Sequence, residues 1–263
     1  AIAERGYWAA FSENPSPKAY GDEAPEAGRA AFQGHLGKPF ELDQPGQAGW
    51  HTDEKSPYGL ALDVRYPVCD PQALMDAALR AMPAWQALGA EGRVGICLEI
   101  LQRLNRQSFE IAHAVMMTSG QGWMMAFQAG GPHAQERGLE AVAYAWREMS
   151  FIPATSTWEK PQGKHPALVM EKHYEIIGRG VAVVIGCATF PTWNTYPGLF
   201  AALATGNPII LKPHGHVVLP AAITVRTIRA VLAENGLDPD LVTLCLPVSH
   251  EAAHTLYTHP DVH

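Results

Sequence analysis

The sequence predicts an α/β fold built on a parallel sheet, and three features of its second half support that prediction. Short apolar, β-branched runs occur at residues 181–186, 207–213 and 241–246, as expected of buried parallel strands. Apolar or amphipathic stretches of helical length separate these runs at 196–206 and 218–236. Strands that alternate with helices in this way form a parallel sheet whose crossover helices pack on it.

Helical spacing also dominates upstream, between residues 71 and 149. Asp70 suits an N-cap, and Pro71 follows it at the first helical position. A second helical stretch covers about 91–120, and a third helix is expected to begin at Pro132, after two glycines. The apolar face of the second stretch consists of Cys97, Ile100, Leu101 and Leu104.

The remaining segments differ in pattern. Residues 1–70 are rich in Pro and Gly, with helical spacing only around 27–32. We interpret this part as an extension that wraps over the rest of the chain, with a loosely ordered arm as the alternative. At 154–180, alternation around Pro and Gly turns predicts a β-hairpin, and Ser249 is expected to cap a last helix. We therefore place a domain boundary at residue 70, with one domain at 71–263.

Composition limits the class of protein. The chain has 263 residues, of which 47% are hydrophobic and 17% charged, so it can bury a sizeable core. A formal charge of −7 gives no electrostatic reason to expect nucleic acid or anionic lipid as a partner. The start has charges where a signal peptide needs an apolar stretch, and no apolar run reaches the roughly 18 residues of a membrane span. With four irregularly spaced cysteines, we expect a cytoplasmic protein with reduced thiols.

One short motif near the end suggests a metal site. His250, Glu251 and His254 spell H-E-x-x-H, the helix motif of zinc peptidases. Such a site needs a third protein ligand, but Tyr257 and Pro260 stand where one arrangement of the motif has Gly and His. We therefore expect a surface helix and no metal site, and a zinc peptidase is the remote alternative.

The most informative stretch is residues 180–215, GVAVVIGCATFPTWNTYPGLFAALATGNPIILKPHG. It resembles the aldehyde dehydrogenase superfamily, in which Gly-Val leads into a strand, a P-W-N-F-P loop follows, and A-x-G-N-x-x-x-x-K-P comes after a helix. The upstream AWQALGAEGRVGICLEILQRL and TSGQ, and YTHPDVH at the end, match further family segments. The resemblance covers about Pro71 to the end. It implies the N-terminal, cofactor-binding (Rossmann-like) part of this fold, with the hairpin at 154–180 as an oligomerisation segment.

The resemblance also implies cofactor-binding residues. Lys212 stands at the end of a strand, where open α/β sheets bind ligands, and would hydrogen-bond the adenosine ribose; a solvated lysine is the alternative. Members that prefer NAD have a Glu three residues later, which would repel a 2′-phosphate. This chain has Gly215 there, and Lys212 with His214 or His216 could pair with the phosphate, so we expect NADP rather than NAD. The backbone that would line the cofactor channel belongs to Ile185, Gly186, Cys187 and Ala188.

The catalytic positions of the family are only partly matched in this chain. The family's loop Asn donates to the oxyanion, a contribution of about 2–4 kcal/mol. Thr189 occupies that position, so either its hydroxyl or the amide of Asn194 would have to replace the donor. Cys187 lies in the same loop, but the family's nucleophile belongs to a distant G-Q-x-C segment. We interpret Cys187 as a small apolar thiol packed at a strand end, with a nucleophile as the alternative.

The resemblance therefore implies the cofactor-binding half of an NAD(P)-dependent aldehyde dehydrogenase. We expect the family's nucleophile, general base and glycine-rich turn to lie beyond His263. FPTWN, YPGLFAALATGNP and GKPFELDQPG are similar to members of the superfamily that act in phenylacetic acid degradation, which implies an aldehyde substrate from that route. A homodimer or homotetramer is expected. A non-catalytic nucleotide-binding or assembly module of the same fold is the alternative.

Overall fold

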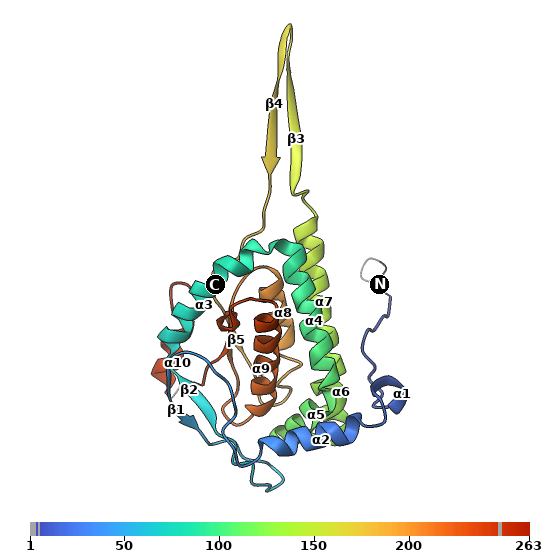
Figure 1. The fold of residues 1–263 in the computed structure, drawn as a ribbon, viewed down its shortest axis with the longest axis vertical. Coiled ribbons are helices and arrows are strands. Elements are labelled where there is room, and N and C mark those ends of the chain that lie inside the picture. The colour runs from blue at the N-terminus through green and yellow to red at the C-terminus, as the bar shows by residue number, and fades with distance from the viewer. Residues whose placement is uncertain (1–3, 5, 247–248) are drawn as a thin grey trace.

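The computed structural model describes residues 4, 6–246 and 249–263, and a three-stranded parallel sheet lies at its centre (Figure 1). The strands, in spatial order, are β5 (Ala182–Ile185), β6 (Ile209–Lys212) and β7 (Val242–Leu244). The helices that follow β5 and β6 are α8 (Tyr196–Ala204) and α9 (Leu219–Glu234), and a short 3-10 helix, η1 (Pro239–Leu241), precedes β7. The predicted α/β fold with a parallel sheet is confirmed.

Both faces of the sheet are buried, because alternate residues of β6 enter different apolar clusters. Ile209 and Leu211 pack with α4, α8 and α9, whereas Ile210 packs with α3 and α10 on the other face. Side chains of a strand alternate between faces, so an uninterrupted apolar strand is the expected pattern for this position. The sheet is therefore the middle layer between two layers of helices.

The helical portion that precedes the hairpin contains five helices. They are α3 (Pro71–Ala87), α4 (Gly89–Arg106), α5 (Ser108–Ser119), α6 (Trp123–Gly130) and α7 (Pro132–Ser150). Asp70 caps α3 as predicted, since its carboxylate accepts from the amides of Gln72 and Ala73. The predicted apolar face at 97–104 is fully buried.

Two details of this portion differ from the prediction. The stretch expected to form one helix over 91–120 is broken at Gln107, whose side chain accepts from Thr227 of α9 instead of continuing a uniform helix. Helix α6 was missed, because its sequence WMMAFQAG is apolar without a helical period and lies between glycines. Both differences arise from tertiary packing that local periodicity does not encode.

Buried polar side chains of α3 and α4 hold the end of α8. Trp85 donates from Nε1 to the carbonyl of Leu203 at 2.9 Å, and Arg93 donates from Nε to the carbonyl of Ala204 at 3.1 Å. Arg93 is only 1% exposed, and its other nitrogens reach the carbonyls of Gln86 and Ile176. These bonds satisfy carbonyls that a helix end leaves without an internal partner.

The turn from α8 into β6 requires glycine. Gly206 has φ +95°, a conformation that L side chains rarely adopt. A Cβ on Gly178 would lie 2.2 Å from the carbonyl oxygen of Gly206, so the two backbones can approach only as glycines. The neighbouring Asn207 accepts from the amide of Arg179 at 2.7 Å. The Thr-Gly-Asn of the family pattern thus joins β6 to the segment that leads into β5.

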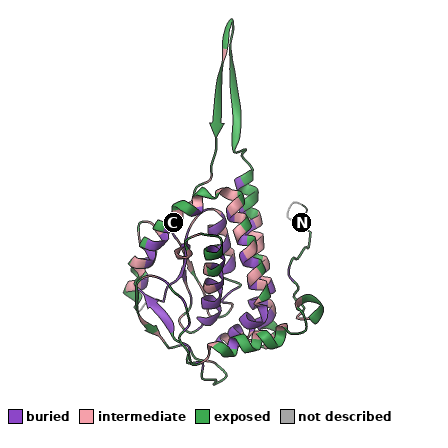
Figure 2. Cartoon of the chain, viewed as in Figure 1, coloured by how far each residue is buried: buried purple, intermediate pink, exposed green. Residues whose placement is uncertain are grey.

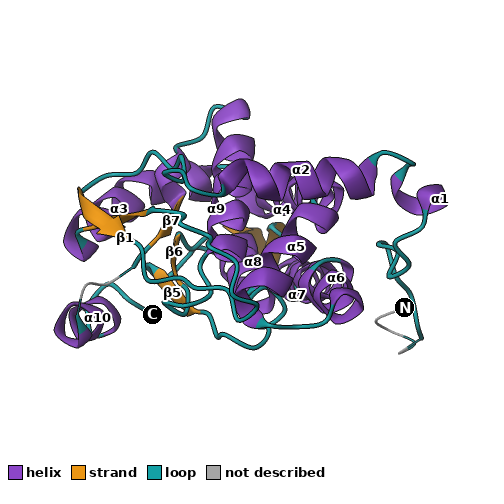
Figure 3. Ribbon diagram, turned by 90° about the horizontal axis from the view of Figure 1, so that it is seen from below, coloured by secondary structure: helices purple, strands orange, loops and turns teal. Residues whose placement is uncertain are grey.

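Part of the N-terminal segment packs on the rest of the chain. Its elements are α1 (Pro17–Tyr20), α2 (Ala24–His35), β1 (Gln47–His51) and β2 (Tyr66–Cys69). Strands β1 and β2 form an antiparallel pair that the sequence analysis did not predict. The large apolar side chains that this segment buries in the main core are Phe11, Phe32, Phe40, Leu42, Leu62, Val64, Tyr66 and Val68. Figure 3 shows β1 close to α3 and β7, on the side of the molecule opposite α1.

The N-terminal segment also protects the edge of the central sheet. The side chain of Gln44 accepts from the amide of Leu244 at 3.0 Å and donates to its carbonyl at 2.6 Å. An edge strand leaves such groups unpaired unless another part of the chain covers them. From Phe32 to Cys69, the segment wraps over the central sheet and its helices.

The predicted hairpin at 154–180 is present and stands apart from the body (Figure 1). It consists of β3 (Thr155–Gln162) and β4 (His165–His173), paired antiparallel. Nearly all its residues are exposed, as Figure 2 shows, including the apolar side chains of Trp158, Leu168, Val169 and Met170. A two-stranded ribbon with exposed apolar side chains has little to stabilise it alone.

The last helix is α10 (His250–Tyr257), and Ser249 caps it as predicted by accepting from the amide of Ala252. Ala253 and Leu256 are its buried residues, and Leu256 packs with α3 on the same face of the sheet. Among the described residues, no helix combines the length and apolar composition that crossing a membrane requires.

Candidate functional site

Two loops meet at the carboxyl ends of the parallel strands. We call residues 186–195, after β5, the β5 loop, and residues 213–218, after β6, the β6 loop. The amide of Gly186 donates to the carbonyl of Lys212 at 2.8 Å, which brings the two loops together. Open α/β sheets bind ligands at this edge. The two loops together contain or adjoin every candidate site residue predicted above.

The β5 loop is folded on itself. Asn194 donates from Nδ2 to Cys187 Sγ at 3.0 Å, and the Cys187 thiol in turn lies 3.7 Å from the carbonyl of Phe190. Cys187 is half-buried. Because its amide faces the sulfur, Asn194 is the loop's hydrogen-bond donor to Cys187 in this conformation.

Two side chains attach the β5 loop to the helical portion. Thr192 is buried, and its hydroxyl donates to the carbonyl of Gly130 at 2.7 Å. Gln121 donates from Nε2 to the carbonyl of Thr189, while its Oε1 is buried with no hydrogen-bond partner among the described residues. Thr189 itself is exposed. Sequence reasoning noted Gln121 only as part of the TSGQ turn and missed this role.

The β6 loop is a tight turn with histidines on it. The amide of Val217 donates to the carbonyl of His214 at 2.9 Å, and the amide of His216 donates to His214 Nδ1 at 3.2 Å. The imidazoles of His214 and His216 are exposed, and Lys212 and Gly215 are half-buried. One lysine and two histidines therefore surround Gly215 in the sequence of this turn.

Gly215 leaves open space at the tip of this turn. The nearest atom that a Cβ would meet is His51 Cε1 at 3.7 Å, which is ordinary contact. His51 donates from Nε2 to the carbonyl of Gly215 at 2.7 Å. A larger side chain at this position would fit without backbone strain, so the glycine is not required by the turn itself.

A buried carboxylate from the N-terminal segment binds the C-terminal end of the β6 loop. Glu54 is 5% exposed and accepts from the amides of Val218 and Leu219 at the start of α9, and from the hydroxyl of Tyr66. Burial raises the pKa of the Glu54 carboxyl, although these hydrogen bonds oppose the shift. Burial and the neighbouring Glu54 raise the pKa of Tyr66 well above its usual value. Glu54 lies in a loop without periodicity, so no local signal indicated its role.

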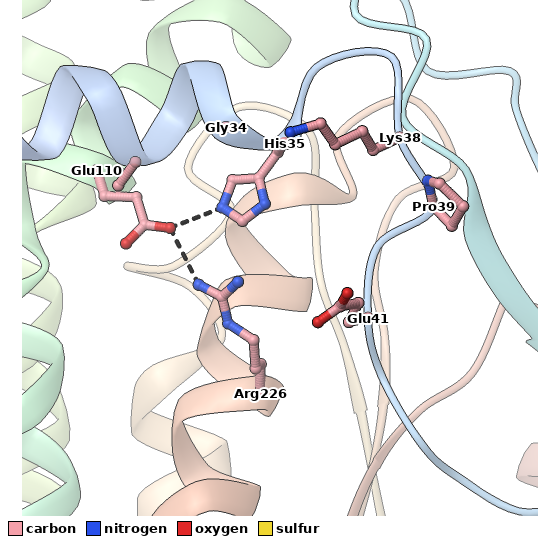
Figure 4. Close-up of a pocket in the computed structure, with 8 residues that line it drawn as sticks. Gly34, His35, Lys38, Pro39, Glu41, Glu110 and Arg226 are labelled. Carbon is pink, nitrogen blue, oxygen red and sulfur yellow. Dashed lines mark hydrogen bonds and ion pairs between the residues drawn. The ribbon is translucent and has the colours of Figure 1, made fainter.

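A separate cavity of about 390 Å³ opens between α2, α5 and α9 (Figure 4). Glu110 projects into it and accepts on one oxygen from both His35 Nε2, at 2.8 Å, and Arg226, at 3.0 Å. Arg226 also lies over the ring of Phe40, 5.1 Å from its centroid. None of the lining residues belongs to the β5 loop or the β6 loop, so this cavity is distinct from the candidate site.

The H-E-x-x-H motif occupies the surface of α10. His250, Glu251 and His254 are all exposed, and His254 lies against the ring of Tyr257 at 6.2 Å between centroids. Within residues 4, 6–246 and 249–263, no group of three His, Cys, Asp or Glu side chains gathers to hold a metal ion. The motif is also remote in sequence from both loops.

Comparison with known proteins indicates the source of this geometry. The profile described as "Aldehyde dehydrogenase family" matches residues 68–263. A crystal structure described as an NAD-dependent aldehyde dehydrogenase from Burkholderia multivorans is 56% identical, with a TM-score of 0.96 over 99% of this chain and 47% of that one.

Two more distant relatives agree in fold or sequence. The Delta-pyrroline-5-carboxylate dehydrogenase of Mycobacterium tuberculosis, solved with NAD, has a TM-score of 0.72 at 17% identity, covering 98% of this chain and 47% of that one. The 1-pyrroline-5-carboxylate dehydrogenase of Bacillus subtilis is 26% identical over 62% of this chain and 30% of that protein. The chain thus spans about half the length of the structures that it matches. Its match to the curated Bacillus subtilis relative covers a smaller share, 30% of that protein.

Proposed function

Because the chain belongs to the aldehyde dehydrogenase family, we propose that it is the cofactor-binding half of an NAD(P)-dependent enzyme that oxidises an aldehyde to an acid. One observation carries the proposal: the bond between Gly186 and Lys212 joins the β5 and β6 loops at the ligand-binding edge of the sheet. We also propose that residues 1–70 are an extension and residues 71–263 are the cofactor-binding domain.

The residues present fit a dinucleotide. The backbone from Ile185 to Ala188 is partly exposed at the end of β5, and Lys212 presents a cation at the end of β6. In this proposal Lys212 hydrogen-bonds the adenosine ribose, and the β5 backbone lines the channel to the nicotinamide. The nucleotide, when bound, supplies a hydride acceptor. In this proposal the residues of the β5 loop and the β6 loop bind and orient the nucleotide.

We infer a preference for NADP over NAD. Gly215 leaves space beside the ribose 2′ position, Lys212 adds a cation there, and the imidazoles of His214 and His216 add hydrogen-bonding groups where a 2′-phosphate would lie. The name of the Burkholderia relative favours NAD instead. Exchanging Gly215 for Glu would introduce a carboxylate that repels the phosphate and accepts from a ribose hydroxyl, so Gly215→Glu is expected to shift the preference toward NAD.

The β5 loop is consistent with two candidate functions, a catalytic dehydrogenase and a module that binds nucleotide without oxidising an aldehyde. If Thr189 or Asn194 donates to the oxyanion, the full enzyme is catalytic. Asn194 donates to Cys187 Sγ, so it must turn away from the sulfur to serve a substrate. That engagement, together with Thr at the family's Asn position, favours the second candidate: a nucleotide-binding or assembly module that keeps the fold without the oxidation.

We further propose the phenylacetic acid degradation (PaaN) type of this family, with an aldehyde from that route as substrate. The support is the sequence similarity at FPTWN, YPGLFAALATGNP and GKPFELDQPG. We also propose a homo-oligomer in which the exposed apolar side chains of β3 and β4 are covered by another subunit. Deleting residues 156–172 is expected to lower the molar mass observed in solution.

The test uses the full-length protein with NADP⁺ and NAD⁺ separately, and measures the dissociation constant of each by titration calorimetry. Wild type is expected to bind NADP⁺ more tightly, Lys212→Ala to lose about tenfold or more for both, and Gly215→Glu to reverse the ratio. An aldehyde series with NADP⁺ then separates the two candidates, since a binding module oxidises none. Absence of binding to either nucleotide would refute both.

A further inference from the structure

We propose that His51 and Glu54, from the N-terminal segment, are positioning residues that set the conformation of the β6 loop and thereby the affinity for the nucleotide. The inference rests on the proposed nucleotide site. It assigns to residues 47–66 a part in cofactor binding that follows from no family motif in the sequence.

The first observation concerns the two ends of the loop. At its tip, His51 donates from Nε2 to the carbonyl of Gly215 at 2.7 Å. At its end, Glu54 accepts from the amides of Val218 and Leu219. Between them the loop has its own bonds to His214, from the amides of Val217 and His216. The tip and the C-terminal end of the loop that carries the basic residues are therefore bound by one short segment, more than 160 residues away in sequence.

The second observation concerns how rigid that segment is. His51 and Tyr66 are directly opposite one another in the β1–β2 ladder, and their rings lie 6.5 Å apart between centroids. Tyr66 is fully buried, and its hydroxyl donates to the second oxygen of Glu54. The ladder and this buried hydrogen bond hold His51 and Glu54 in one arrangement. A rigid support of this kind keeps a binding group in its productive geometry.

The third observation is that α9 has no local cap. Its N-cap residue is Val218, which has no side-chain acceptor, and Pro220 has no amide hydrogen. Glu54 supplies the missing acceptor from outside the helix. The start of α9 is occupied by this carboxylate, so the helix end is a support for the loop and not a free anion site.

The consequence for binding is preorganisation. A loop held in its binding conformation before the nucleotide arrives loses less conformational entropy on binding. Removing the His51 bond frees the tip of the turn, where Gly215 lies between the basic side chains. We expect affinity for the nucleotide to fall while the core and the overall fold remain.

The experiment compares variants of the full-length protein that differ in the hydrogen bond alone. His51→Phe keeps a ring beside Tyr66 and removes the donor. His51→Gln places an amide nitrogen at a similar reach and is expected to restore the bond. Gln47→Ala, an exposed position on the same strand, is the matched control. The two readouts are the dissociation constant for NADP⁺ and amide hydrogen exchange in residues 213–219 without nucleotide.

We expect His51→Phe to raise the dissociation constant about five- to tenfold and to speed exchange at 213–219, with His51→Gln near wild type and the melting temperature little changed. Unchanged exchange, or faster exchange with unchanged affinity, would overturn the inference. Equal losses of affinity for NADP⁺ in His51→Phe and Gln47→Ala would also overturn it. If wild type binds no nucleotide, the proposed function fails and this inference fails with it, while the exchange data still report whether His51 holds the loop.

Discussion

The β5 loop and the β6 loop lie side by side at one edge of the sheet, but different parts of the chain hold them. The β5 loop is bound by its own residues and by the helical portion, through Thr192 and Gln121. The β6 loop is bound by the N-terminal segment, through His51 and Glu54. Two halves of one candidate site therefore depend on supports that can be changed independently, and each loop can serve as the control for the other.

The largest effect is expected for Glu54→Ala, which would break the support of the β6 loop. The change leaves two amides and the Tyr66 hydroxyl without an acceptor in a buried place, which is expected to lower the free energy of unfolding by about 2–4 kcal/mol. Chemical denaturation measures this loss. Asp53→Ala, an exposed neighbour, is the control and should change the free energy of unfolding little. A loss equal to the control would mean that Glu54 is not a structural support.

A smaller effect is expected for Thr192→Val, which acts on the β5 loop alone. Removing the hydroxyl leaves the Gly130 carbonyl without its donor, at a cost of about 1 kcal/mol. Amide exchange should become faster in residues 186–195 and stay unchanged in 213–218. Thr52→Val, at an exposed position, is the matched control. Faster exchange in both loops would contradict the independence of the two supports.

A change in pH dependence is expected for Glu54→Gln, which keeps an acceptor for the α9 amides. Burial raises the Glu54 pKa in the folded state above its ordinary value, so the native protein holds this proton more tightly than the unfolded chain does. The contribution of Glu54 to the free energy of unfolding therefore falls as the pH rises from the ordinary carboxyl pKa through the raised folded value.

In Glu54→Gln the free energy of unfolding should fall less steeply with rising pH than in wild type. Asp53→Asn should show the same slope as wild type. Denaturation curves collected across this pH window measure the slope for each protein. A steeper decline in Glu54→Gln than in wild type would show that the folded carboxyl has a lowered pKa, with its hydrogen bonds outweighing burial.

The smallest effect on the structure is expected from a thiol probe of the β5 loop. Burial raises the pKa values of Cys97 and Cys245 to about 12, so both thiols stay protonated and covered at neutral pH. Cys187 is half-buried and should be alkylated first by iodoacetamide, as peptide mass spectrometry would show.

Nucleotide should slow the alkylation of Cys187 if this residue lines the cofactor channel. Cys187→Ser should remove the fast modification and leave the other thiols as they are. Reaction of Cys97 or Cys245 at the rate of Cys187 in the native protein would indicate that the core is open.

Local patterns were sufficient for much of the fold. The apolar runs, the Asp70 and Ser249 caps and the alternation at 154–180 each predicted an element that the structure contains. The elements that were missed are α1, α6, η1 and the β1–β2 pair, and the break at Gln107 was not predicted. Helix α6 has no amphipathic period, and the mostly exposed β1 is stable because it pairs across a long loop with β2, which is buried.

Periodicity and turn residues act over a few positions, so local patterns were enough to predict the sheet, the crossover helices and the two loops. The same patterns placed Lys212, His214 and Gly215 at the end of one strand. The side chains that support these residues became known only from the folded chain. His51, Glu54 and Gln44 act through contacts across 164 to 200 residues, and Gln121 acts across 68. Such contacts leave no local pattern, because a buried polar side chain is defined by the groups that surround it in space.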